Sequence, residues 1–141
     1  MKSPNRDSWF VPTAVIGVLY CIIGFVFALP SHQVRMWRLA AWVASAVLYA
    51  AHIAYEHLRL RNSARSIALH VAAAVAIGAF GLAVVAFIHS LFVPPNYTRW
   101  RFGVALIAWP LITALPAFVV ALTVAWLLIR FFTVRSGQFR H

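Results

Sequence analysis

The stretch IALHVAAAVAIGAFGLAVVAFIHSLF, residues 67–92, is a run of 26 residues without an acidic residue, lysine or arginine. A helix rises ~1.5 Å per residue, so ~20 apolar residues are enough to cross the hydrocarbon core of a bilayer. Similar apolar runs precede and follow this one, separated by short segments that carry basic residues. The sequence therefore predicts an all-α integral membrane protein with four transmembrane helices, at about residues 10–29, 34–57, 66–92 and 102–132.

The overall composition favours the same fold class. The chain has 141 residues, of which 64% are hydrophobic, and its only acidic residues are Asp7 and Glu56. A water-soluble domain needs many more charged side chains on its surface. No segment outside the four runs is long enough to form a second domain. Residues 1–141 are therefore expected to be a single domain, an up-down bundle of four helices joined by short links.

The net charge of +10 does not indicate a nucleic-acid-binding protein. The basic residues stand at the ends of the apolar runs rather than along one polar face, which nucleic-acid binding would require. At helix ends they fit contacts with lipid headgroups. The expected partner is therefore the lipid bilayer.

The distribution of lysine and arginine predicts the orientation of the chain. Eight of these residues lie in the N-terminal segment, the second link and the C-terminal end, and four lie in the first and third links. Links rich in lysine and arginine stay in the cytoplasm, so both termini are expected there. The excess of arginine over lysine and the many alanines favour a bacterial source, which makes the inner (cytoplasmic) membrane the expected location.

Small residues gather on one face of the first and third runs. The set expected to pack helices together comprises Gly17, Cys21, Gly24, Gly78 and Gly81. In lipid, small residues allow helix backbones to approach closely, and this close packing drives association. The face is either a dimerisation surface or a contact between helices of one chain, and the second interpretation is the simpler one.

The fourth run contains Pro110 and Pro116. Each proline removes a backbone hydrogen bond, so this helix is expected to bend. Thr113 lies between them, where its hydroxyl can bond to a carbonyl that a proline has freed. Kinked helices occur in channels and transporters, and also in many membrane proteins that transport nothing.

The second run carries a polar and aromatic stripe along its whole length. At ~100° per residue, its members fall within an arc of about 100°. Polar side chains are costly in a membrane and normally face a protein interior or a wet cavity, so the stripe should point inward. Its members are Arg38, Trp42, Ser45, Tyr49, His52, Glu56 and Arg59.

The end of this stripe is the candidate site. Glu56 is expected to pair with Arg59, or with Arg61 or Arg65 of the following link. In that link, Asn62 and Ser63 are predicted to form the turn and the N-cap of the third helix. His70 should lie at the same depth as His52, because the two stand at equal distances from the middle of the link.

Several kinds of chemistry fit these residues. Ser45, Tyr49, His52, Glu56, Arg59 and His70 are expected to form a polar intramembrane network, which either pins two helices together or serves as a proton relay. Two histidines on adjacent helices are also candidate ligands for a b-type haem or a metal. A zinc site lacks an evident third or fourth ligand beyond His52, His70 and Glu56.

The sequence shows no motif that would indicate catalysis. The sequence contains no glycine-rich phosphate loop, no pair of carboxylates and no standard metal motif. We therefore expect a non-catalytic membrane protein with no cofactor, acting as an accessory subunit of a membrane partner protein or as a homo-oligomer. The alternatives are an oligomeric channel, transporter or proton relay that uses the stripe, and a haem-binding electron carrier that uses His52 and His70.

Overall fold

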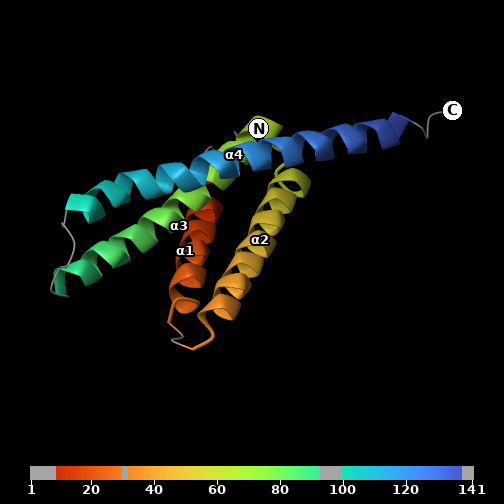
Figure 1. Ribbon diagram of the computed structural model, residues 1–141. Coiled ribbons are helices and arrows are strands. Elements are labelled where there is room, and N and C mark those ends of the chain that lie inside the picture. The colour runs from red at the N-terminus through yellow and green to blue at the C-terminus, as the bar shows by residue number, and fades with distance from the viewer. Residues whose placement is uncertain (1–8, 30–31, 93–99, 138–141) are drawn as a thin grey trace.

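The structure, a computed structural model, describes residues 9–29, 32–92 and 100–137 and contains four helices in this part of the chain (Figure 1). They are α1 (Phe10–Val26), α2 (Val34–Leu58), α3 (Ala64–Phe92) and α4 (Trp100–Gly137). The prediction of an all-helical protein with four helices is confirmed. Helix α1 ends at Val26 rather than near residue 29, and α4 continues beyond residue 132 to Gly137.

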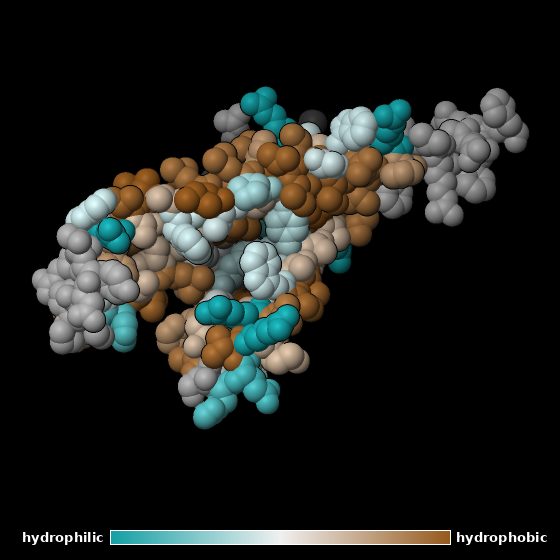
Figure 2. Space-filling model, viewed as in Figure 1, coloured by the Kyte–Doolittle hydropathy of each residue, from teal (hydrophilic) through white to brown (hydrophobic). Residues whose placement is uncertain are grey.

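Three of these helices are long and apolar enough to cross a membrane. They are α2, α3 and the segment Trp100–Phe131 of α4. Helix α1 is apolar but has only 17 residues, at the lower limit of what a spanning helix needs. In Figure 2, apolar side chains cover most of the visible surface over α3 and α4, and hydrophilic side chains gather near helix ends.

Helices α1 and α3 pack closely through their glycines. A Cβ atom on Gly78 would lie 2.5 Å from the Cβ atom of Tyr20 and 3.0 Å from the carbonyl oxygen of Gly17. Gly17 itself faces Ile77 just as tightly. The structure also places Gly24 against Leu82, and Gly81 against the Cys21 sulfur. All five residues singled out for helix packing therefore lie at a contact within one chain.

Helices α3 and α4 lie side by side and run antiparallel (Figure 1). The core lies where the start of α3 meets the later part of α4, and Ile53 of α2 closes it. Its buried members are Ile53, Ile67, Ala68, Val71, Ala121 and Ala125. Alanine on α4 brings its backbone close to α3, as small residues do in the α1–α3 contact.

Helix α4 is continuous across Pro110 and Pro116. Thr113 donates its hydroxyl to the carbonyl of Trp109 at 2.9 Å and to that of Pro110 at 3.1 Å. The carbonyls that lose a helical donor to the two prolines are those four residues earlier, at Leu106 and Ile112. The expected repair by Thr113 of a freed carbonyl is therefore wrong, and the bend at the prolines stays a prediction.

Helix α2 differs from its neighbours because its buried residues lie only near its C-terminal end; towards its N-terminal end, the ring of Trp37 contacts that of Phe27, with centroids 5.7 Å apart. The buried residues of α2 are His52, Ile53 and Glu56, and Trp42 is 77% exposed. Figure 1 shows α2 leaving α3 and α4 towards its N-terminal end, so the arrangement is more open than an even bundle. Arg38 and Trp42 of the polar stripe are exposed, so the stripe does not face the other helices along its whole length as expected.

Candidate functional site

The candidate site forms where the end of α2 meets the beginning of α3. A short link joins the two helices, and Arg61 in it takes the left-handed backbone conformation with φ 50°. This conformation turns the chain so that the Asn62 amide N–H donates back to the Glu56 carbonyl at 3.4 Å. The predicted N-cap is confirmed, since the Ser63 hydroxyl oxygen accepts the Ser66 amide N–H at 3.3 Å. The link therefore holds both helix ends beside Glu56.

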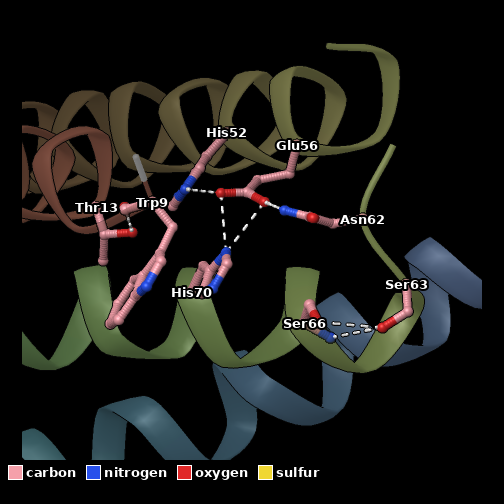
Figure 3. A network of polar contacts seen from close by, with 8 residues as sticks. All are labelled: Trp9, Thr13, His52, Glu56, Asn62, Ser63, Ser66 and His70. Carbon is pink, nitrogen blue, oxygen red and sulfur yellow. Dashed lines mark hydrogen bonds and ion pairs between the residues drawn. The ribbon is translucent and has the colours of Figure 1, made fainter. Parts of the chain in front are cut away.

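Glu56 is the centre of the site, and its side chain is fully buried. Nδ1 of His70, on α3, lies 3.1 Å from each carboxylate oxygen (Figure 3). The Asn62 side-chain amide donates to Oε2 at 2.5 Å. Nε2 of His52, one turn earlier on α2, lies 3.7 Å from Oε1, which is an ion-pair distance rather than a hydrogen bond. We call Glu56, His52, Asn62 and His70 the carboxylate cluster.

Burial explains why this carboxylate needs so many partners. A buried charge is costly unless it is paired and hydrogen-bonded. The contacts of His70 and Asn62 satisfy both oxygens of Glu56. His52 is 1% exposed, and among the described residues neither of its ring nitrogens has a hydrogen-bond partner. His52 thus lies within ion-pair distance of Glu56 without making a hydrogen bond to it.

Trp9, the residue before α1, also contacts the site. Its indole ring stacks on the imidazole of His70, with ring centroids 4.9 Å apart and planes inclined by 4° (Figure 3). The carbonyl of Trp9 accepts the hydroxyl of Thr13 at 2.8 Å, and Thr13 is buried. The start of α1 is therefore fastened to α3 at the same residue that holds Glu56.

Some of the residues expected in the polar network lie elsewhere. The Tyr49 hydroxyl donates to the carbonyl of Ala117 on α4 at 2.5 Å, so it ties α2 to α4 instead of joining the cluster. Ser45 is half-buried further along α2, and Arg59 is exposed. The structure brings together His52, Glu56 and His70 of the expected set.

The expected arginine partner of Glu56 is wrong. Among the described residues, its ion pairs are with His52 and His70, while Arg59, Arg61 and Arg65 are exposed. Arginine carries its charge on a long stem that reaches towards water, whereas imidazole is compact enough to be buried beside a carboxylate. Asn62 and Trp9 were not anticipated in these roles, because only the three-dimensional path of the link and of α1 brings them here.

The arrangement does not fit a haem held between two histidines. Both imidazoles approach the Glu56 carboxylate, which occupies the space between them, and Trp9 covers one face of the His70 ring. In the part of the chain that the structure describes, no group of three or more histidine, cysteine, aspartate or glutamate side chains has the geometry of a metal site. The carboxylate cluster joins α2 to α3, and the stack of Trp9 on His70 adds the start of α1.

Comparisons with protein-family models, with curated proteins and with solved structures each found no match for this chain.

Proposed function

We propose that this chain is a four-span integral membrane protein with a non-catalytic role, an accessory subunit that docks the N-terminal half of α2 against another membrane protein. The observation that carries the proposal is the uncovered part of the α2 stripe.

The exposed apolar side chains support a membrane location. Ile107 and Phe131 on α4 and Phe92 on α3 are among many large apolar residues that face outward. A soluble monomer rarely carries a continuous apolar surface of this extent, whereas lipid covers it without cost. Helix α1 would be the shortest of four spans. The composition still favours the bacterial inner membrane, and the distribution of lysine and arginine favours both termini in the cytoplasm.

The stripe of α2 supports a docking role. Its last part, at His52 and Glu56, is buried inside the chain. Its first part is not, since Arg38 and Trp42 are exposed. A polar stripe within a membrane normally faces protein or a wet cavity rather than lipid. A partner helix lying along residues 38–45 would cover it.

Charge favours a different protein over a second copy as that partner. Arg38 needs an acidic or hydrogen-bond-accepting group opposite it. Glu56 is the only acidic residue that the structure describes, and it is buried and paired. Two copies meeting at this face would bring arginine towards arginine, which opposes association. We therefore propose a partner helix with an acidic side chain.

Site-specific photocrosslinking in native membranes tests this role. A photoreactive amino acid at Trp42 should give an adduct with one partner protein, and the Arg38→Gln change should reduce its yield severalfold. The same amino acid at Ile107, an outward position on α4, is the matched control and should give no such adduct. An adduct of twice the chain mass would instead show a homo-oligomer. A chain that crosslinks to no protein from Trp42 would contradict the docking role.

The carboxylate cluster favours one alternative, a proton relay in an oligomeric channel or transporter. The Glu56 carboxylate lies 3.1 Å from His70 and 3.7 Å from His52, so three titratable side chains form a row in which Glu56 and His52 are buried. The alternative comes second because the row has no described continuation: the next polar side chain of the stripe, Tyr49, gives its hydroxyl to Ala117. If a relay operates, Glu56→Gln abolishes proton flux in proteoliposomes while the protein stays folded. Unchanged flux would exclude it.

A further inference from the structure

A pocket lies beside the carboxylate cluster, between the end of α2 and the later part of α4. Its volume is about 490 Å³, and its lining residues are His57, Leu58, Arg61, Asn62 and Ile129. The lining is of two kinds: a guanidinium, an imidazole and an amide on one side, and two aliphatic side chains on the other. A site of this kind suits a ligand that has an anionic end and an apolar end.

The surroundings of the pocket are basic. Arg59, Arg61 and Arg65 in and next to the link are exposed, and Glu56 is buried and paired with His70 inside the cluster. An anion that enters the pocket therefore meets positive charge without competition from a free carboxylate among the described residues. The negative end of the α2 dipole opposes an anion only weakly, and it acts only within the last turn of the helix. The positive charge of the three nearby arginines outweighs this effect of the dipole.

The position of the pocket along the helices favours a lipid over a soluble anion. Helix α2 ends at Leu58, where its apolar run gives way to the basic link, so the pocket lies at the level of lipid headgroups if α2 spans the membrane. Leu58 is 64% exposed and offers an apolar surface next to the arginine. Basic pockets between helices on the cytoplasmic side of a membrane bind acidic headgroups.

We propose that this pocket binds the phosphate of an acidic phospholipid through Arg61, with the acyl chain along Leu58 and Ile129. The inference rests on the membrane location in the proposed function but not on the docking of a partner. Asn62 connects the two sites, because it lines the pocket and also donates to the Glu56 carboxylate. Lipid binding therefore stabilises the link that holds the carboxylate cluster.

The experiment uses the full chain in nanodiscs and follows thermal unfolding by tryptophan fluorescence. Replacing a third of the phosphatidylcholine with phosphatidylglycerol should raise the unfolding temperature by about 5 °C, since a ligand that binds only the native state stabilises it. Arg61→Gln should remove most of this increase. Arg101→Gln, which removes an exposed arginine at the other end of the apolar runs, is the matched control and should retain it.

A second variant at Arg61 distinguishes loss of lipid binding from a folding defect. Arg61 has a positive φ that glycine adopts freely, so Arg61→Gly removes the charge while relieving the backbone. It should unfold normally in phosphatidylcholine and show no response to phosphatidylglycerol. A response that survives both Arg61 variants, or an absence of any response in the unmodified chain, overturns the proposal.

Two further arms separate the possible sources of failure. If inorganic phosphate in phosphatidylcholine nanodiscs gives the same increase, the ligand is a free phosphate and the lipid assignment is wrong. If the chain does not float with phosphatidylcholine vesicles, the membrane location itself fails and the lipid site fails with it. If it floats but does not respond to phosphatidylglycerol, the lipid site alone is refuted.

Discussion

Removal of the Glu56 carboxylate should destabilise the chain more than any other single polar change. In Glu56→Ala, His70 and Asn62 both lose the acceptor that they share, and His52 loses its charge partner. Breaking a buried ion pair by removing one partner costs ~3–5 kcal/mol. The His70 side chain is 17% exposed and can regain water, so the expected loss lies near the lower end, at about 3 kcal/mol.

The magnitude for Glu56→Gln follows from the same contacts. Glutamine keeps the shape and one acceptor oxygen, so the packing survives and only the charge and one acceptor are lost. Interhelical hydrogen bonds in membranes contribute ~0.6 kcal/mol on average and at most ~1.7 kcal/mol. We expect Glu56→Gln to cost about 1 kcal/mol, clearly less than Glu56→Ala.

Reversible unfolding by SDS in mixed micelles measures these free energies. The Glu56→Ala/His70→Ala double mutant should show a coupling energy of about 1 kcal/mol, because the two side chains touch. Thr123→Ala is the control: its hydroxyl donates only to Val119 of the same helix, so the change should stay within ~0.5 kcal/mol. A Glu56→Ala protein as stable as the control would refute the view that the cluster joins the helices.

Two further predictions concern the contacts of α1. Gly78→Ala should destabilise the chain by ~1–3 kcal/mol, because the new Cβ would lie 2.5 Å from Tyr20. Gly103→Ala is the control and should be neutral or stabilising, since nothing lies within 4 Å of its new Cβ. Equal losses of stability in SDS unfolding would contradict the close packing of α1 and α3. Trp9→Ala should cost about 1 kcal/mol through loss of the stack on His70. Tryptophan fluorescence would check the stack, since quenching of Trp9 should disappear in His70→Ala, and an unchanged spectrum would argue against it.

Much of the fold could be predicted from hydrophobicity because helix length and apolar runs are local properties of the sequence. The start of α2 at Val34 and the end of α3 at Phe92 agree with the expected ranges. The splaying of α2 could not be predicted, since it depends on how closely backbones approach rather than on any single helix.

The candidate site was predictable in part for a similar reason. Helical spacing places His52 one turn before Glu56, and the symmetry of the link places His70 opposite. The role of Asn62 depends on the left-handed turn at Arg61, a conformation that arginine rarely takes and no local pattern indicates. Trp9 is distant in sequence from His70, so its stack depends on the packing of α1 against α3.

The unequal lengths of α1 and α3 have a consequence for the surrounding bilayer. At ~1.5 Å per residue, the 17 residues of α1 extend only ~25 Å, less than a ~30 Å hydrocarbon core, whereas the 29 residues of α3 extend ~43 Å and exceed it. A long helix relieves such hydrophobic mismatch by tilting, and a short one by thinning the lipid around it. Two helices with opposite mismatch, fixed together by their glycines, cross at an angle, as Figure 1 shows. In a membrane, the lipid next to α1 would be thinner than the lipid next to α3, so this small protein would deform its bilayer only where α1 lies.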